Sequence, residues 1–253
     1  MVDATAKIAL VTGAASGLGF AIAERLAQDG FHTIAVDRNS DVVSVAETWQ
    51  ANGLSVEAQV LDLADTDAIG KLIMGVENNY GRLDVLVNNA GISPKIDGKR
   101  ADSETMPLAQ WHEVLAINLT APFHLSRLAM PLMRKNGWGR IVNIASRAGR
   151  TYVRTAGAHY TATKAGLIGL SRMMAGEFAA HGITVNTIAP GRIETPLSEQ
   201  GSAEMLAALK AEIPVGRAGR PDEIGATVSF LVGPSSGFIT GAVLDINGGV
   251  TMV

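Results

Sequence analysis

The stretch Lys7-Ile8-Ala9-Leu10-Val11-Thr12-Gly13-Ala14-Ala15-Ser16-Gly17-Leu18-Gly19 decides the fold. Its first five residues are a short apolar run that predicts a buried strand, and residues 20–26 have the apolar spacing of a helix that Gly30 ends. Strand, glycine-rich turn and helix, in that order, are the context of a dinucleotide-binding site. Glycines let the backbone approach a ligand closely, and a helix N-terminus offers free N–H groups to a pyrophosphate. The spacing is G-x-x-x-G-x-G rather than G-x-G-x-x-G, so a connector without chemical importance is the alternative interpretation.

The second predicted strand ends in an acidic residue. Residues 32–36 are apolar, and Asp37 and Arg38 follow them. A carboxylate about 20 positions beyond the glycine turn can accept hydrogen bonds from the ribose hydroxyls of NAD, and its charge repels the 2′-phosphate of NADP. Arg38 is a complication, because its side chain could swing onto such a phosphate. The sequence therefore favours NAD as the cofactor.

Strand and helix patterns alternate along the rest of the chain. Helical patterns cover residues 41–52, 65–80, 107–135 (with bends expected at Pro122 and Pro131), 160–181 and a stretch that starts at Pro221; strand patterns cover residues 55–61, 83–87, 139–145, 183–188 and 242–246. Such alternation predicts βαβ units and a parallel sheet with the strand C-termini on one edge. We see no repeat or linker, and we predict an α/β fold in one domain over residues 1–253. Residues 93–106 are expected to be a loop, and residues 192–214 a mobile, partly helical substrate flap.

The composition excludes several classes of protein. The formal charge of -3 gives no electrostatic footprint for nucleic acid or an anionic membrane, and no apolar run has the length of a membrane span. The absence of cysteine excludes disulfides and thiolate chemistry and fits a reducing cytoplasm. No group of His, Asp and Glu has metal-ligand spacing, so we expect no catalytic metal. These features predict a cytoplasmic protein without a membrane anchor.

The chemistry is expected at Ser146, Tyr160 and Lys164. Residues four apart share a face of a helix, so the Tyr160 phenol and the Lys164 ammonium would lie one above the other. A nearby ammonium lowers the pKa of a phenol, and a phenol that titrates closer to neutral pH can exchange a proton with a substrate oxygen. Ser146, at the end of an apolar run, could hold the same oxygen. A Tyr-x-x-x-Lys pair taken alone is more often plain helix surface.

These motifs together resemble those of the short-chain dehydrogenase/reductase family over essentially the whole chain. The matching positions are Thr12-Gly13-x-x-x-Gly17-x-Gly19, Asp37, Asp62, Asn88-Asn89-Ala90-Gly91, Asn118, Ser146, Tyr160-x-x-x-Lys164 and Pro190-Gly191-x-x-x-Thr195. The resemblance implies a Rossmann-type, doubly wound, seven-stranded parallel sheet, hydride transfer with a nicotinamide cofactor, and a homotetramer or homodimer. One departure is a loop of thirteen residues, rather than twelve, between Ser146 and Tyr160. The extra residue alters the wall of the substrate pocket.

The resemblance also implies roles for single residues. Tyr160 would be the proton donor or acceptor, Ser146 would polarise the substrate oxygen, and Lys164 would bind the nicotinamide ribose and lower the Tyr160 pKa. Asn118 would anchor a water in the proton relay, although a locally hydrogen-bonded helix asparagine is the default interpretation. The expected cofactor-binding residues are Gly13, Ser16, Gly17, Leu18, Gly19, Asp37, Arg38, Asp62, Leu63, Asn89, Ala90, Gly91, Tyr160, Lys164, Pro190, Gly191, Ile193 and Thr195.

Several cationic and polar residues border the expected substrate pocket. Ser146, Tyr160, Arg147, Arg154, His159 and Arg192 are the candidate substrate-binding residues, and Arg150 and Lys95 lie on segments that border the same expected pocket. One or two of these cations could bind a carboxylate, sulfonate or phosphate, while solvent exposure or a subunit contact is the plainer alternative. His159 is expected to be a pocket wall or packing residue rather than a base.

We predict an NAD-dependent enzyme that interconverts a secondary alcohol, such as a sugar or hydroxy acid, and its ketone or lactone. The alternatives are a 3-oxoacyl thioester reductase, which usually uses NADP, and a non-catalytic NAD-binding sensor.

Overall fold

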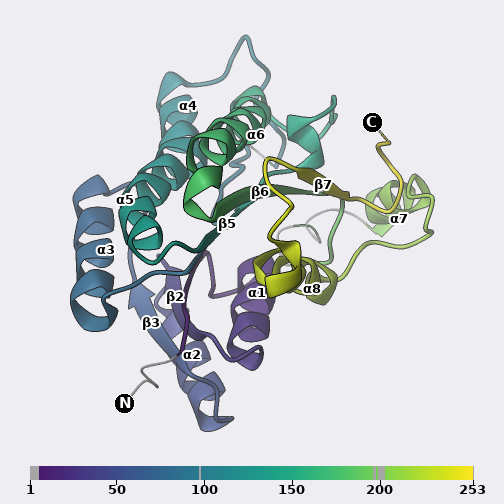
Figure 1. Ribbon diagram of the computed structural model, residues 1–253. Coiled ribbons are helices and arrows are strands. Elements are labelled where there is room, and N and C mark those ends of the chain that lie inside the picture. The colour runs from purple at the N-terminus through teal and green to yellow at the C-terminus, as the bar shows by residue number, and fades with distance from the viewer. Residues whose placement is uncertain (1–5, 97, 196–197, 199–202, 253) are drawn as a thin grey trace.

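The computed structural model describes residues 6–96, 98–195, 198 and 203–252, and its backbone forms one parallel sheet covered on both faces by helices (Figure 1). The seven strands are β1 (Ile8–Thr12), β2 (His32–Asp37), β3 (Val56–Val60), β4 (Val85–Asn88), β5 (Gly139–Ile144), β6 (Ile183–Pro190) and β7 (Val243–Ile246). The eight α-helices in the described residues are α1 (Gly17–Gln28), α2 (Asp41–Ala51), α3 (Thr66–Tyr80), α4 (Leu108–Leu115), α5 (Ala121–Lys135), α6 (Ala158–Phe178), α7 (Ala203–Ala211) and α8 (Pro221–Val232).

The strand order places the predicted motifs on one edge of the sheet. The order is β3-β2-β1-β4-β5-β6-β7, and every neighbouring pair is parallel. The chain runs outward from β1 to β3, and then crosses back to start β4 on the other side of β1. Ligands of doubly wound sheets bind at such a switch point, outside the carboxyl ends of the strands. The Rossmann-type, seven-stranded, single-domain fold is confirmed.

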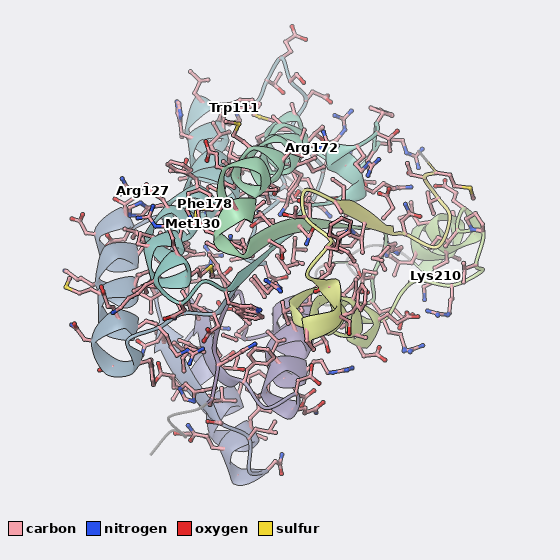
Figure 2. The ribbon with its side chains drawn as sticks, in the orientation of Figure 1. Trp111, Arg127, Met130, Arg172, Phe178 and Lys210 are labelled. Atoms are coloured by element: carbon pink, nitrogen blue, oxygen red, sulfur yellow. The ribbon has the colours of Figure 1, made fainter. Side chains whose placement is uncertain are left out.

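The strands are apolar because both faces of the sheet are buried. One hydrophobic cluster joins β1, β4 and β5 to α3, α5 and α6, and includes Met130 and Phe178 (Figure 2). The second cluster joins the opposite face of the sheet to α1, α2 and α8. In Figure 1, α3 to α6 accordingly lie on one side of the sheet and α1, α2 and α8 on the other.

The predicted helix over residues 107–135 is divided into three helical segments. Between α4 and α5 the chain forms a π-helix, Ala116–Thr120, whose wider turn interrupts the α-helical register. Pro122 lies in the first turn of α5, directly after the π-helix, so its missing N–H removes a hydrogen bond from a continuous helical stretch, while Pro131 lies inside α5. The bends expected at the two prolines stay predictions. The π-helix contains Asn118, so the irregularity falls on a residue of the predicted site.

Candidate active site

The glycine turn between β1 and α1 is held against the end of β4. Asn89 donates its side-chain N–H to the carbonyl oxygen of Thr12 at 2.8 Å, and the Thr12 hydroxyl accepts from the backbone N–H groups of Asn89 and Ala90. A Cβ atom on Gly13 would lie 2.8 Å from the Asn89 amide nitrogen, and one on Gly19 would lie 1.9 Å from the Gly13 carbonyl oxygen. These contacts exclude side chains and leave an open backbone cradle, as a dinucleotide site requires.

Asp37 is fixed beside the same turn. One of its carboxylate oxygens accepts from the Ala15 N–H at 2.9 Å, and the other accepts from the Asn39 N–H at 2.9 Å. The carboxylate therefore both orders the turn and places a negative charge where a ribose would meet β2. Arg38, the next residue, is exposed and lies at the same end of the cavity.

Tyr160, Ser146 and Lys164 come together as expected. Tyr160 and Lys164 lie on the first turns of α6, and Ser146 follows β5. The Ser146 side chain is a hydrogen-bonding partner of the Tyr160 phenol. The Lys164 ammonium lies 5.6 Å from the centre of the Tyr160 ring and donates to the Ile144 carbonyl oxygen at 2.8 Å.

The pKa of Tyr160 differs from the sequence-based expectation. Burial raises the pKa of the phenol, and the hydrogen bond with Ser146 offsets only part of that rise. Burial also lowers the pKa of Lys164 to about 8, because a charged ammonium loses hydration there. The net effect on the Tyr160 pKa is therefore a rise, opposite to the lowering by Lys164 that the sequence predicts.

Asn118 connects the π-helix to the loop after β4. Its side-chain oxygen accepts from the Ile92 N–H at 2.8 Å, and its side-chain N–H donates to the Ile92 carbonyl oxygen at 2.9 Å. A Cβ atom on Gly91 would lie 3.3 Å from both the Asn118 amide oxygen and the Lys164 nitrogen. The amide thus fixes the loop beside Lys164, and its role in a water relay stays a prediction.

His159 is a buried residue in the first turn of α6. Its Nδ1 accepts from the Tyr160 N–H at 2.6 Å, and its Nε2 has no hydrogen-bond partner among the described residues. Burial lowers the pKa of the imidazole and favours the neutral ring. His159 does not line the cavity, so its position matches the packing interpretation rather than a substrate contact.

A cavity of about 530 Å³ joins the glycine turn to Tyr160. Most of the predicted site residues line it; Gly19 and Asn118 lie behind its wall, and Arg154 is exposed outside it. The lining residues not identified from the sequence include Val153, Thr155 and Ala156 of the Ser146–Tyr160 loop, together with Leu209, Glu212, Ile213 and Val250. The sequence could have indicated Val153, Thr155 and Ala156 as lining residues, because they lie in the loop between Ser146 and Tyr160. No local pattern indicates Val250, which reaches the cavity through the turn after β7.

The cationic side chains near the cavity have different partners. Arg150 forms an ion pair with Asp245 at 3.0 Å, and an Arg192 N–H donates to the Ser198 carbonyl oxygen. Arg147, Arg192 and Lys95 line the cavity, whereas Arg150 does not. The structure therefore separates the candidate cations into those that face the cavity and those that do not.

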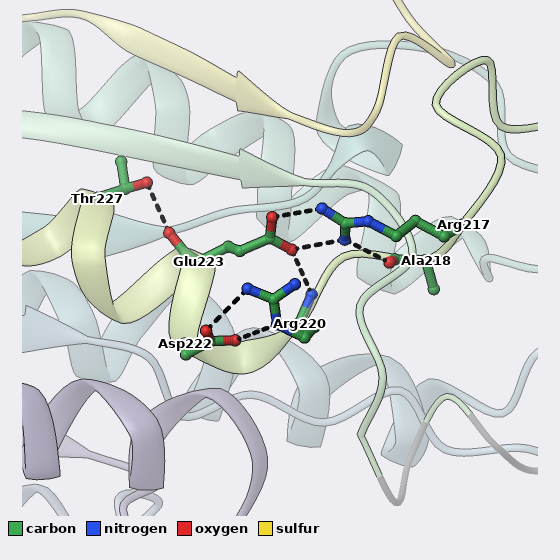
Figure 3. A network of polar contacts seen from close by, with 6 residues as sticks. All are labelled: Arg217, Ala218, Arg220, Asp222, Glu223 and Thr227. Carbon is green, nitrogen blue, oxygen red and sulfur yellow. Dashed lines mark hydrogen bonds and ion pairs between the residues drawn. The ribbon is translucent and has the colours of Figure 1, made fainter.

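The predicted flap begins at a pair of backbone hydrogen bonds, and an ion-pair network follows its end. Ile193 pairs with Gly219 through two backbone hydrogen bonds, Glu194 N–H to Gly219 O and Gly219 N–H to Arg192 O. The Arg217 guanidinium donates to both oxygens of Glu223, which also accepts from the Arg220 N–H at the start of α8 (Figure 3). Further along the flap, α7 carries Lys210, labelled in Figure 2, whose ammonium lies 3.7 Å from Glu194. Residues 196–197 and 199–202 lie outside the described part, and the mobility of the flap stays a prediction.

None of the helices that the structure describes is long and apolar enough to cross a bilayer. Within the same residues, no three His, Asp or Glu side chains gather in a way that could hold an ion, and the absence of a metal remains an expectation.

Comparisons with known proteins agree with this arrangement. The family model described as enoyl-(acyl carrier protein) reductase matches residues 13–251. The 3-oxoacyl-[acyl-carrier-protein] reductase FabG of Escherichia coli is 39% identical over 248 residues, covering 98% of each chain. A crystal structure of a 3-oxoacyl-[acyl-carrier protein] reductase with bound NAD from Brucella melitensis is 35% identical, with a TM-score of 0.90 over 98% of this chain and 92% of that one. A structure of a putative NAD(P) dependent gluconate 5-dehydrogenase from Beutenbergia cavernae with bound NADP is 38% identical, with a TM-score of 0.89 over 97% of each chain. On these matches and motifs, the chain belongs to the short-chain dehydrogenase/reductase family.

Proposed function

We propose that this protein is a nicotinamide-dependent oxidoreductase that interconverts a ketone and a secondary alcohol, with Tyr160 as the acid–base group. The observation that carries the proposal is the single cavity that Tyr160, Ser146 and Lys164 line together with the glycine turn. In the reducing direction, the Tyr160 and Ser146 hydroxyls donate to the substrate carbonyl oxygen, and the Tyr160 proton moves to that oxygen as negative charge develops on it. A bound nicotinamide dinucleotide supplies or accepts the hydride.

The protonation state of Tyr160 connects this geometry to the direction of reaction. A raised pKa keeps the phenol protonated at neutral pH, which is the form needed to reduce a ketone. Oxidation of an alcohol needs the phenolate as base. Reduction is therefore favoured near neutral pH and oxidation at higher pH.

NAD is the proposed cofactor because of Asp37. The carboxylate lies at the ribose end of the cavity, and a 2′-phosphate there would meet a like charge. Arg38, at the same end, carries a positive charge that favours NADP instead. The compared structures differ, since the reductase from Brucella melitensis has bound NAD and the dehydrogenase from Beutenbergia cavernae has bound NADP. Asp37→Ser is expected to shift the ratio of kcat/KM values toward NADPH by about 10²-fold.

Two classes of substrate are candidates. Two of the compared proteins are 3-oxoacyl-[acyl-carrier-protein] reductases, and this similarity supports a 3-oxoacyl thioester better than the sugar or hydroxy acid expected from the sequence. The cations that line the cavity favour a polar or anionic hydroxy compound.

The test is a panel of 3-oxoacyl thioesters, oxo acids, hydroxy acids and sugars, followed at 340 nm with NADH and with NADPH. Tyr160→Phe is expected to lower kcat by about 10²–10⁴-fold while leaving NADH binding, measured by its fluorescence, intact. Unchanged turnover in that variant would refute the assignment of Tyr160. Binding of NADH without turnover of any member of the panel would favour the non-catalytic sensor.

A further inference from the structure

Cationic side chains from three separate segments line the cavity that holds Ser146 and Tyr160. They are Lys95 from the loop after β4, Arg147 from the short 3-10 helix after Ser146, and Arg192 after β6, and Glu212 also lines the cavity. Arg150 is already neutralised by Asp245, and Arg154 lies outside.

Arg147 differs from the other two cations. Lys95 is exposed to solvent, and Arg192 is engaged with the Ser198 carbonyl oxygen. Arg147 is half-buried, and among the described residues no acidic side chain lies within 4.0 Å of its guanidinium. A partly desolvated guanidinium without a counter-ion is costly, and an anionic ligand removes that cost. Its planar fork suits a carboxylate in bidentate geometry.

The place of Arg147 in the chain limits where the anion lies. Arg147 directly follows Ser146 through a trans peptide, so their Cα atoms are about 3.8 Å apart. Ser146, Tyr160 and Arg147 all line one cavity, so an anion held by Arg147 would share that cavity with the oxygen that Ser146 and Tyr160 polarise. The phosphate of a long carrier arm lies too far from the reacting carbon of a 3-oxoacyl thioester to occupy this position.

We propose that Arg147 forms a carboxylate subsite, so that the substrate of this enzyme is a short oxo acid or hydroxy acid with a free carboxylate close to the reacting carbon. The inference rests on the proposed function. Lys95 adds a longer-range attraction at the mouth of the cavity without a fixed contact. A thioester or ester of the same acid lacks the charge that Arg147 binds, so the free acid is the preferred form.

The experiment compares matched pairs that differ only in this charge: short 2-oxo and 3-oxo acids against their methyl esters, including acetoacetate against methyl acetoacetate. The unmodified enzyme is expected to favour the best acid over its ester in kcat/KM. Arg147→Met should lower that ratio by about 10²–10³-fold, mostly through KM, and Arg147→Lys by less. Arg172→Met, which removes an exposed arginine on α6 (Figure 2), is the matched control and should leave the ratio unchanged.

A readout without turnover makes the test independent of catalysis. Butanoate, which cannot be reduced, is expected to raise the melting temperature of the unmodified enzyme and not that of Arg147→Met, whereas butanamide should affect neither. A preference for esters or thioesters over free acids, or an equal loss for acid and ester in Arg147→Met, would overturn the subsite and leave the proposed function standing. Retention of turnover by Tyr160→Phe would instead remove the proposed function.

Discussion

The Lys164 ammonium lies in a buried site, where the charged form is unfavourable. The side chain is buried, and its nitrogen donates to one carbonyl oxygen, that of Ile144. Burial lowers the pKa of the ammonium to about 8, so the folded state disfavours the charged form. A group retained at such a cost serves a purpose other than stability, and its position beneath Tyr160 indicates catalysis.

Replacement of Lys164 by Met is therefore expected to separate stability from activity. The ligand-free variant should unfold at a higher temperature, by roughly 2–4 °C for each 1 kcal/mol gained, while kcat/KM falls by about 10²–10³-fold. Between pH 8 and 10.5 the unfolded state of the unmodified chain binds more protons at Lys164 than the folded state, so the unmodified chain gains stability as the pH rises. Scanning calorimetry at pH 7 and pH 9.5 checks this, because the gap between the two proteins should narrow at the higher pH. A variant less stable than the unmodified chain at pH 7 would contradict the argument.

His159 shows how a residue outside the cavity can position one inside it. Its Nδ1 accepts from the Tyr160 N–H, an otherwise unpaired donor in the first turn of α6. Protonation of the ring would place a second donor against that N–H. Because the folded pKa lies below the usual 6.5, the unfolded state binds more protons in the window below pH 6.5. The free energy of unfolding therefore falls as the pH falls through that window.

Asparagine offers an acceptor that does not titrate, so His159→Asn tests this role. The variant should keep near-normal turnover at pH 7 and lose less activity than the unmodified enzyme as the pH is lowered toward 5. His159→Leu removes the acceptor and should cost about 1 kcal/mol of stability at every pH. Denaturant unfolding and pH–rate profiles of the three proteins give the comparison. Identical acid limbs in the unmodified enzyme and the asparagine variant would show that His159 has no such role.

At the scale of elements, the turn between β1 and α1 depends on the absence of side chains. Gly19→Ala would place a Cβ atom 1.9 Å from the Gly13 carbonyl oxygen. We expect this clash to lower the free energy of unfolding by about 3 kcal/mol or more and to abolish NADH binding. Gly70, in the middle of α3, has open space around its missing Cβ atom. Gly70→Ala should therefore stabilise the protein by about 0.5–1 kcal/mol without affecting NADH binding. Urea unfolding and NADH fluorescence distinguish the two. A mild effect of Gly19→Ala would mean that the turn relaxes more easily than its contacts suggest.

The elements that the sequence predicts well are those with a local cause. Residues 7–11 and 139–145 are apolar because a parallel sheet buries both faces, and both runs form strands within about one residue of their predicted bounds. The sequence does not predict the π-helix at Ala116–Thr120, and its Asn118 pairs with Ile92, 26 positions earlier, a contact that no local pattern indicates. Val250 and Leu209 likewise reach the cavity only through tertiary contacts. Desolvation of Tyr160 and Lys164 is also a property of the folded chain, which is why the pattern alone misjudged the phenol pKa.

At the scale of the whole molecule, the two edges of the sheet differ. β3, at one edge, has exposed Gln59 and Val60. β7, at the other, is half-buried, with three apolar residues and Asp245, and exposed Phe230 and Phe238 lie on α8 and in the segment between α8 and β7. Unprotected strand edges and exposed aromatic side chains are typical of association surfaces. The surface around β7, Phe230 and Phe238 is therefore where we expect the contacts of a homodimer or homotetramer. The assembly itself stays a prediction.

Light scattering during size-exclusion chromatography tests whether the chain associates through the surface around β7, Phe230 and Phe238. The unmodified chain should elute as a multiple of its 26.4 kDa mass. The double variant Phe230→Glu and Phe238→Glu should elute as a smaller species, because each substitution would place a carboxylate in an apolar interface. Both side chains are exposed in the single chain, so the fold of each protomer should survive, and circular dichroism verifies this. Met74→Glu changes an apolar residue on α3, away from β7, that is about as exposed as Phe230, and should leave the mass unchanged. If the double variant keeps the full assembly, the chain associates through another face, with the helices α4 to α6 as the next surface to substitute.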